Sequence, residues 1–332
     1  MKKFLALFLA VLMILGTFAG CKTGGEDETT AEPKPTQTPE EEAVLRVLAI
    51  GNSHTNDCTQ LLQYVFSKEM PEQKVLIGNM YYSGCSLTQH VGFAMENKPV
   101  YVYYKNDSGV WSETRETALS TALSEQIWDV IVLHDMNNST ASGHSFAAPS
   151  LQVLINYVKQ QSPYPATLIW NMGWSNPTAE EFFDPSYFIQ GPSTWKENYQ
   201  RDFGFDYNNL FQKLVQNTQE HVITNENISA MAPTGMAFTY ARNVLGMTDL
   251  DLYRDYTHTS DYGALIAAYV WYATITGKTE ITDINIDVIP ANQRHNHFKG
   301  DGDLVITEEM QDVLVKAVNY ALANPLTIPE EK

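Results

Sequence analysis

The sequence predicts an α/β fold of three layers, an α/β/α sandwich in which a mainly parallel sheet of five strands is covered by helices on both faces. Apolar runs and helical patterns alternate from residue 44 onward, which is typical of βαβ units. The apolar runs are nearly continuous, as expected of parallel strands buried on both faces. Hydrophobic residues make up 44% of the chain and charged residues 18%. This composition suits a large core and excludes a disordered chain.

Five apolar runs are predicted as strands because each is short and begins or ends near turn residues. They are residues 44–50, 74–81, 129–134, 167–172 and 221–230. Helical periodicity between and after them predicts seven helices. These are residues 56–68, 117–126, 150–161, 193–216, 235–245, 262–276 and 307–322.

Two segments fall outside this alternation. Residues 100–111 carry three tyrosines before an Asn-Asp-Ser-Gly turn, which predicts a β-hairpin inserted outside the main sheet. Residues 174–195 contain three prolines and one glycine and are predicted as a long loop. We expect one domain over residues 43–332.

The N-terminus has the pattern of an export signal. Lys2 and Lys3 precede an apolar run and small residues that end at Cys21, so residues 1–20 are predicted as a signal peptide. The approach to Cys21 resembles the lipobox of bacterial lipoproteins, which implies lipidation of Cys21 and an anchor in the membrane at the cell surface. The acidic, Thr- and Pro-rich residues 21–42 are predicted as a tether. The alternative is a secreted protein with an incidental cysteine.

The chain is strongly acidic. Its formal net charge is −18, and residues 43–332 hold 32 of the 39 acidic and 17 of the 21 basic residues, a charge of about −15. Such a body excludes nucleic acid as a partner, because phosphate binding requires clustered cations. It also favours neutral substrates over polyanionic ones.

Cys58 and Cys85 are the two cysteines left after Cys21. An exported protein can keep a disulfide, and each of the two follows a candidate active-site motif. A disulfide between them and two reduced, partly buried thiols both remain open.

Reactive groups in an open α/β sheet gather at the carboxyl ends of its strands. Ser53 follows the first strand in Gly51-Asn52-Ser53, at the start of a predicted helix. A serine needs an adjacent base to act as a nucleophile. His258 can supply that base, and Asp255, three residues earlier, can orient its ring within one turn.

The order of these motifs resembles the SGNH hydrolase superfamily, also called GDSL-like esterases, and in particular bacterial members whose first motif reads GNS. The resemblance covers residues 45–277 and implies a flavodoxin-like fold. It implies Ser53 as nucleophile, His258 as general base and Asp255 as its orienter. The oxyanion hole would include the backbone N–H groups of Ser53 and Gly84.

The resemblance also implies an asparagine donor after the third strand. Counting along the strand from Asp129 puts this donor at Asn138, with Asn137 as the second choice. The usual Gly-x-Asn-Asp motif is absent there, and His134 stands where the closer members often have Gln. His134 would either donate to the oxyanion or cap the strand end.

No metal or cofactor is expected. His295 and His297 near Asp301 and Asp303 match no zinc motif, and a calcium ion at the two aspartates would be structural. Several aromatic side chains fall on or after strand ends, where they would be core anchors or a platform for sugar rings. They are Tyr81, Tyr82, Trp170, Trp174 and Trp195.

These features together predict an exported serine hydrolase of carboxylic esters, acting through an acyl-enzyme. The expected partner is an ester-bearing small molecule or glycan, and O-deacetylation of an extracellular glycan is the favoured reaction. One alternative is a lipase-like or acyl-transferring enzyme whose long acyl groove is lined by residues 174–188. The other is a glycan-binding lipoprotein on the same scaffold without catalysis.

Overall fold

The apolar runs form one sheet of seven strands in the order β4-β3-β2-β1-β5-β6-β7. The computed structural model describes residues 44–187, 189–294 and 302–331. Five neighbouring strands are parallel, and β3 and β4 pair antiparallel at one edge. The parallel strands are β1 (Val44–Gly51), β2 (Lys74–Tyr81), β5 (Val130–Leu133), β6 (Thr167–Asn171) and β7 (Ala230–Ala232). The predicted five-stranded parallel core is therefore confirmed.

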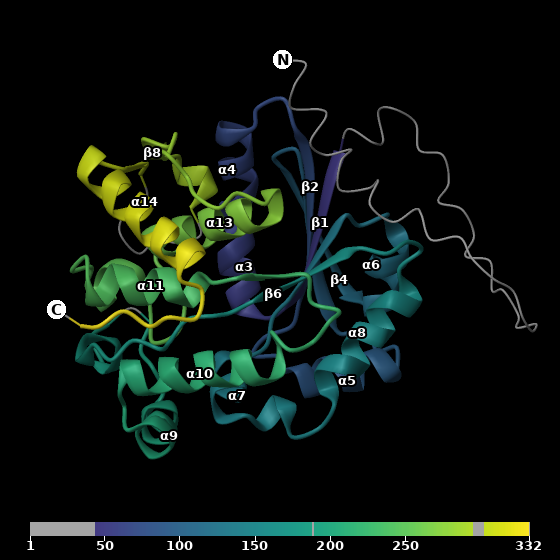
Figure 1. Ribbon diagram of the computed structural model, residues 1–332, viewed down its shortest axis with the longest axis horizontal. Coiled ribbons are helices and arrows are strands. Elements are labelled where there is room, and N and C mark those ends of the chain that lie inside the picture. The colour runs from purple at the N-terminus through teal and green to yellow at the C-terminus, as the bar shows by residue number, and fades with distance from the viewer. Residues whose placement is uncertain (1–43, 188, 295–301, 332) are drawn as a thin grey trace, which may run out of the picture. The chain divides into compact units, whose positions relative to one another are not determined.

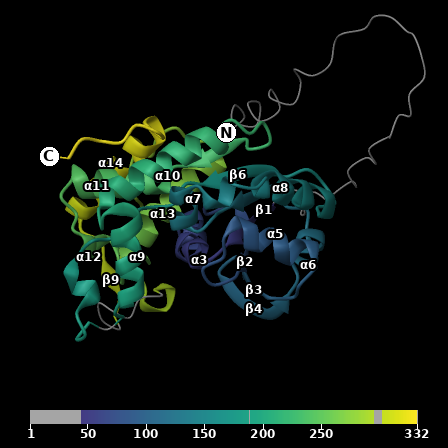
Figure 2. The same cartoon turned by 90° about the horizontal axis from the view of Figure 1, so that it is seen from below.

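Helices cover both faces of the sheet, as the α/β/α prediction requires. Figure 1 shows α3, α4 and α13 on one side of the sheet and α5, α6 and α8 on the other, and the second view agrees (Figure 2). On the first side lie α3 (Ser53–Gln60), α4 (Leu62–Glu69), α11 (Thr234–Asn243), α13 (Asp261–Thr276) and α14 (Glu308–Ala323). On the second lie α5 (Leu87–Met95), α6 (Leu119–Glu125) and α8 (Ser150–Gln161).

Helix α13 is the centre of the first helical layer. Every residue from Gly263 to Ala273 is buried, because α13 packs against α3 and α4 on one side and α11 and α14 on the other. A helix that is apolar all round is stable only when it is enclosed in this way. The loop that precedes α13 is thereby held against the body of the protein.

The hairpin of β3 (Tyr101–Asp107) and β4 (Val110–Thr117) corrects one prediction. It lies within the main sheet, because β3 pairs antiparallel with β2 from Leu76 to Tyr81. Tyr101 and Tyr103 are buried there. The hairpin covers the backbone N–H and C=O groups that an edge strand β2 would expose.

Two further predicted elements were wrong in extent. Residues 193–216 are two helices, α9 (Ser193–Phe203) and α10 (Tyr207–His221), because the chain turns at Gly204 with φ +72°. Helix α10 continues to His221, and the strand predicted at 221–230 is instead β7, Ala230–Ala232, which shares only Ala230 with the prediction. The intervening turn is closed by the Asn225 side chain, which accepts from the N–H of Asn227 at 3.0 Å.

The remaining elements are short. They are α7 (Asn137–Ser142), α12 (Asp249–Leu252), three 3-10 turns at His144–Phe146, Glu180–Phe183 and Ala291–Gln293, and a small antiparallel pair of β8 (Val288–Ile289) and β9 (Leu304–Val305). The predicted signal peptide, Cys21 and the tether to residue 42 lie outside the described residues, as do Phe188, His295, His297 and Asp301. None of the helices in the described part is long and apolar enough to cross a membrane.

Candidate active site

A cavity of about 870 Å³ opens at the carboxyl edge of the parallel strands. Its walls come from the residues that follow β1, β2 and β5 and from the loop before α13. Ser53, Gly84, Asn138 and His258 all line it. The structure therefore brings four of the five residues predicted for catalysis to one cavity, and the fifth, Asp255, contacts His258 directly.

Ser53 is the first residue of α3, where the backbone turns from β1 into the helix. Asn52 caps this helix, because its side-chain oxygen accepts from the N–H of His54 at 3.0 Å. The other end of the Asn52 amide donates to the carbonyl of Cys85 at 3.0 Å. Asn52 thus ties the serine turn to the loop that contains Gly84.

The turn after β2 contains Gly84, which lines the same cavity as Ser53. Gly84 has φ +59°, in the left-handed region, and the turn is closed by the N–H of Cys85 donating to the carbonyl of Tyr82 at 3.2 Å. The first N–H groups of a helix have no acceptor within the helix. Ser53 is the first residue of α3, so its N–H has no acceptor within the helix, and Ser53 and Gly84 both line the cavity.

Asp255 and His258 form a tight pair in the loop before α13. His258 Nδ1 lies 2.8 Å from Asp255 Oδ2, and the backbone N–H of His258 donates to Asp255 Oδ1 at 2.8 Å. Asp255 is buried, whereas 23% of the His258 side chain is exposed. Because Nδ1 is bound to the carboxylate, Nε2 is the ring nitrogen that is free to exchange a proton.

The charge of Asp255 is maintained despite its burial. Burial alone would raise the pKa of Asp255, but the hydrogen bonds and charge of His258, with the charge of Arg254, outweigh it and hold this pKa below its usual value. Asp255 is therefore an ionised carboxylate at neutral pH. It can orient the imidazole ring of His258 and stabilise its protonated form.

The two asparagines after β5 have different roles. Asn137 is buried, and its Nδ2 donates to the carbonyl of Trp174 at 2.7 Å. Asn138 is partly exposed, and its Oδ1 accepts from Asn176 Nδ2 at 2.7 Å. The amide of Asn138 thus keeps its donor end for the cavity, so Asn138 fits the predicted oxyanion position better than Asn137.

His134 has neither of the roles expected for it. Its ring is buried, with Nε2 3.4 Å from His54 Nδ1 and Nδ1 3.2 Å from the carbonyl oxygen of Asn171. Burial lowers the pKa of His134 to about 4, an effect that the Asn171 carbonyl partly offsets. The pKa of His54 lies well below 6.5, because of burial and then of the nearby charges of His134, His258 and Arg254. Both rings are therefore neutral at neutral pH.

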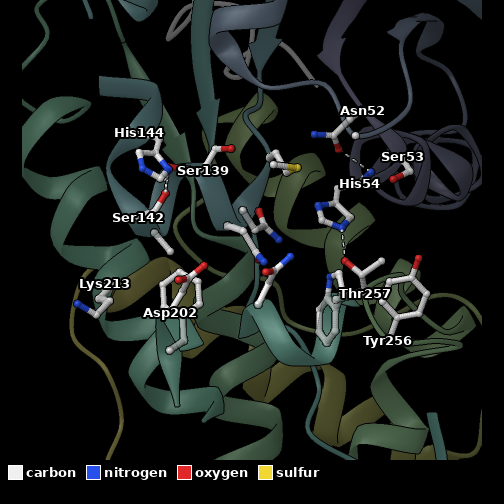
Figure 3. A pocket seen from close by; sticks show the side chains of 18 of the residues that line it. Asn52, Ser53, His54, Ser139, Ser142, His144, Asp202, Lys213, Tyr256 and Thr257 are labelled. Atoms are coloured by element: carbon white, nitrogen blue, oxygen red, sulfur yellow. Dashed lines mark hydrogen bonds between the residues drawn. The ribbon is translucent and has the colours of Figure 1, made fainter. Parts of the chain in front are cut away.

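Figure 3 shows the two ends of the cavity. Ser53 and His54 extend from the start of α3, with Tyr256 and Thr257 close by, and Ser139, Ser142, His144 and Lys213 lie toward the other end. Ser142 Oγ is 3.0 Å from His144 Nδ1. This exposed pair is a second serine and histidine in the same cavity.

The predicted aromatic platform is reduced to one residue. Trp170 and Trp174 are buried in the core, and Tyr82 packs on Phe93 with ring centroids 4.8 Å apart. Trp195 lines the cavity and meets Tyr256 edge to face at 5.1 Å. No described residue of the predicted acyl groove, 174–187, lines the cavity.

Both cysteines are free and buried, so the structure has thiols and not the alternative disulfide. In the described ranges no group of three or more Cys, His, Asp or Glu side chains is placed to hold a metal ion. Asp303 accepts from the N–H of Ala291 at 2.9 Å and holds the turn before the undescribed residues.

Sequence reasoning missed Asp57, His54, Thr257 and Asn176, which support the site. Asp57 lies one helical turn after Ser53, and its buried carboxylate accepts from the N–H of Thr259 at 3.0 Å. Asp57 could have been found as an acidic residue on the inner face of a predicted helix, since a buried charge is nearly always paired. The sequence has no comparable pattern that predicts the contacts of the Asn176 amide and the Thr257 hydroxyl.

The fold and the cavity together define a three-layer α/β protein with a serine and an Asp–His pair at the carboxyl edge of its sheet. A family model described as "Domain of unknown function (DUF4886)" matches residues 46–285. The chain belongs to this family. No curated protein sequence is similar enough to the chain to count as a match.

Solved structures give three comparisons. A DUF4886 family protein from Bacteroides uniformis is 22% identical, with a TM-score of 0.67 over 86% of this chain and 98% of that one; it has the same fold. A putative SGNH hydrolase from Slackia heliotrinireducens is 18% identical, with a TM-score of 0.46 over 70% and 99%. An acetyl-xylooligosaccharide esterase from Geobacillus stearothermophilus is 14% identical, with a TM-score of 0.41 over 70% and 94%.

Proposed function

We propose that the protein is a serine esterase of the SGNH type that removes short acyl groups from an extracellular glycan. The observation that carries this proposal is the convergence of Ser53, the Asp255–His258 pair and the candidate oxyanion donors on one cavity. These are the groups that acyl transfer through a serine requires.

The reaction follows from these positions. His258 Nε2 takes the proton of Ser53 Oγ as this oxygen attacks the ester carbonyl carbon. The resulting oxyanion is stabilised by the donors of Ser53, Gly84 and Asn138. The C–O bond of the ester then breaks, the alcohol leaves with the proton from His258, and an acyl-serine remains. Water, activated by His258, attacks the acyl carbon and releases the acid.

Acetyl is the favoured acyl group because polar and small residues surround Ser53. Asn52 precedes Ser53 and is bound to the loop that contains Ser83 and Gly84, and all three line the cavity and offer little apolar surface to a long acyl chain. The aromatic side chains of Trp195 and Tyr256 offer apolar faces on which a sugar ring can stack. In the cavity lining, Arg201 is paired with Asp202 at 2.7 Å and Lys213 adds one positive charge, so the preference for neutral glycans rests on the net charge of about −15 of residues 43–332.

The lipid anchor at Cys21 and the position at the cell surface are also proposed. They rest on the sequence pattern around Cys21 and on the tether that follows it. They would keep the enzyme beside extracellular polymers. Mass spectrometry of the membrane fraction should find Cys21 as the lipidated N-terminal residue; an unmodified chain in the medium would contradict the anchor.

The decisive experiment is labelling of the purified protein with a serine-directed phosphonate, followed by mapping of the adduct by mass spectrometry. We expect the adduct on Ser53 and its loss in Ser53→Ala and in His258→Ala, with a fall in esterase rate of at least about 10³-fold. Ser142→Ala is the matched control, since Ser142 lies beside His144 in the same cavity.

Two outcomes would oppose the proposal. An adduct on Ser142 would indicate that Ser142, with His144, is the nucleophile in place of Ser53. A folded protein that neither reacts nor hydrolyses acetyl esters, including acetylated oligosaccharides, would favour glycan binding without catalysis.

A further inference from the structure

A line of polar side chains runs from the buried end of β6 to the cavity. It joins Asn171, His134, His54, Thr257, Asn176 and Asn138, and we call it the polar chain. The successive contacts are 3.2, 3.4, 3.1, 3.2 and 2.7 Å. Apart from Thr257 and Asn138, its members are at most 5% exposed. It ends on the candidate oxyanion donor.

The inner end of the polar chain has a fixed orientation. Asn171 Oδ1 accepts from the indole N–H of Trp271 at 3.0 Å and from the hydroxyl of Thr234 at 2.7 Å. An indole N–H can only donate, so this end of the Asn171 amide must be its oxygen. The amide nitrogen therefore faces His134 Nδ1 at 3.2 Å, and it donates to this nitrogen when the ring proton of His134 is on Nε2.

A neutral imidazole carries one ring proton, so a ring that accepts a hydrogen bond at one nitrogen donates a hydrogen bond from the other. When His134 Nδ1 accepts, the proton of this ring is on Nε2 and is donated to His54 Nδ1 at 3.4 Å. The proton of His54 is then on Nε2 and is donated to Thr257 Oγ at 3.1 Å. Figure 3 shows this last contact between His54 and Thr257.

The Thr257 hydroxyl continues the series of hydrogen bonds toward the cavity in the same donor-to-acceptor direction. Its hydroxyl accepts from His54 and donates to Asn176 Oδ1 at 3.2 Å. Asn176 Nδ2 donates in turn to Asn138 Oδ1 at 2.7 Å. A planar amide whose oxygen is bound on one side presents its N–H groups on the other.

We propose that the polar chain is a positioning device that holds Asn138 with its amide donor, and not its oxygen, toward the oxyanion. This inference rests on the proposed function, because it assigns a role only if Asn138 contacts the reacting oxygen. Within the polar chain, Asn171, His134, His54, Thr257 and Asn176 are positioning residues. None of them needs to touch the substrate to affect the rate.

The direction of the hydrogen bonds matters because the opposite one is also possible. His134 Nδ1 lies 3.2 Å from the carbonyl oxygen of Asn171 as well. A proton on Nδ1 would be donated there, and every bond from His134 to Asn138 would reverse. Asn138 would then face the oxyanion with a lone pair, which would repel it.

Thr257 offers a selective way to break the polar chain. Its backbone is held independently of its hydroxyl, since its N–H donates to Asp255 Oδ1 at 2.9 Å and its carbonyl accepts from the indole of Trp174 at 3.0 Å. Thr257→Val removes the hydroxyl and keeps the shape. Thr257→Ser keeps the hydroxyl and removes only a methyl group.

The test is the hydrolysis rate of a chromogenic acetyl ester by the full-length protein. We expect Thr257→Val to lower kcat by roughly 10 to 100-fold with KM within about threefold, because removal of one oxyanion donor costs about 10² to 10³-fold and this variant misorients the donor without removing it. We expect Thr257→Ser to restore kcat to within about threefold of the unchanged protein. Thr239→Val is the control, because Thr239 is buried and its hydroxyl donates to the carbonyl of Gly235 at 2.9 Å outside the polar chain.

A Thr257→Val protein with unchanged kcat would overturn the inference, and so would an equal loss in Thr257→Ser. A second measurement does not depend on activity. Nitrogen-15 NMR of labelled histidine should show His54 and His134 as neutral rings protonated on Nε2, with signals assigned by His54→Gln and His134→Gln. A proton on Nδ1 of either ring contradicts the inference. If Ser53→Ala keeps full activity, the proposed function fails while the NMR result still decides the direction of the polar chain.

Discussion

Asp57 and Arg254 form a buried ion pair that joins the helix of Ser53 to the loop of His258. Arg254 Nη1 donates to Asp57 Oδ1 at 2.8 Å, and the same nitrogen donates to the carbonyl of Thr259 at 2.8 Å. The other oxygen of Asp57 accepts from the N–H of Thr259 at 3.0 Å. Asp57 thus binds both sides of the segment that carries Asp255 and His258.

This ion pair leads to a first prediction. Asp57→Asn leaves Arg254 without its full countercharge, so we expect the free energy of unfolding to fall by about 3 kcal/mol. We also expect kcat to fall at least tenfold, because the loop can shift the His258 ring away from Ser53. Urea unfolding and steady-state hydrolysis of an acetyl ester measure the two effects.

Asp249→Asn is the matched control. Asp249 is also buried and pairs with Arg242 at 2.9 Å, but its carboxylate otherwise binds the N–H groups of Thr178 and Ala179, outside the segment that carries Asp255 and His258. We expect a similar loss of stability with kcat within about twofold of the unchanged protein. Equal kcat values for the two variants would show that the Asp57 pair only stabilises the fold.

The second prediction concerns close packing behind the cavity. A Cβ atom on Gly173 would lie 1.9 Å from Asn137 Oδ1 and 2.9 Å from His134 Cε1. Gly173→Ala should therefore displace both side chains and lower the free energy of unfolding by about 2 kcal/mol or more. Gly246→Ala is the comparison, because Gly246 has φ +79° and open space around it, and should cost only about 1 kcal/mol. A smaller loss for Gly173→Ala than for Gly246→Ala would contradict the packing argument.

The third prediction is a loss of stability in mild acid. Burial lowers the pKa of His90 to about 3 and of His134 to about 4, and lowers that of His54 as well. Below pH 6.5 the unfolded chain binds protons at these residues that the folded chain does not. The free energy of unfolding should therefore fall as the pH drops from about 6.5 toward 4.

Asp135 acts in the opposite direction. Burial raises the pKa of Asp135 to about 6, partly offset by hydrogen bonds from the Thr140 hydroxyl at 2.7 Å and the Leu87 N–H at 2.9 Å. The folded state therefore binds an extra proton here as the pH falls from about 6 to 4, which adds stability. The three histidines lower the free energy of unfolding as the pH falls and the one aspartate raises it, so we expect a net decrease. Urea unfolding at pH 7, 6 and 5 measures it.

His90→Phe isolates one contribution to this pH dependence. The His90 ring stacks on Tyr101 with centroids 5.6 Å apart, and a Phe ring keeps this contact without a titrating group. The variant should lose about 1 kcal/mol at pH 7, since the 2.7 Å contact with the Tyr101 hydroxyl is lost. Between pH 7 and pH 5, however, its stability should fall by about 1 to 2 kcal/mol less than that of the unchanged protein. An identical slope would rule out His90 as a source of the acid sensitivity.

The fourth prediction is that Cys58 and Cys85 do not react in the folded protein. Burial raises the pKa of both thiols, with Asp57 adding to the shift at Cys58 and Asp135 at Cys85. The thiolate is the reactive form, so iodoacetamide at pH 8 should modify neither residue until denaturant is added. Mass spectrometry of the digested protein reads out each position separately. Rapid labelling of either cysteine under native conditions would contradict the burial.

The elements predicted best were those with a strong local pattern. Strand β2 and helix α8 were predicted to the residue, because a short apolar run and an amphipathic period each determine their own geometry. Helix boundaries were missed at Gly204, where an interior glycine takes a left-handed conformation. The place of the β3–β4 hairpin was missed because strand pairing depends on an edge that exists only in the folded sheet.

In the candidate site, too, local features were predicted from the sequence and long-range contacts were not. The spacing of Asp255 and His258 predicts a contact within one turn, and Ser53 is placed by the strand and helix around it. Asn138 was assigned by counting along the strand from Asp129, but its amide orientation depends on Asn176, 38 residues away. His54 and Thr257, separated by 203 residues, gave no sign of their contact.

The sequence by itself determined the order of strands and helices, the cluster of candidate catalytic groups at one edge of the sheet and the acidity of the body. These depend on side-chain periodicity, local turns and composition, which act over a few residues. Only the tertiary structure supplies the hydrogen-bond partners from which we infer the proton positions on His134 and His54 and the orientation of Asn138. Folding brings these partners together, from Asn171 to Thr257, in a space that excludes water.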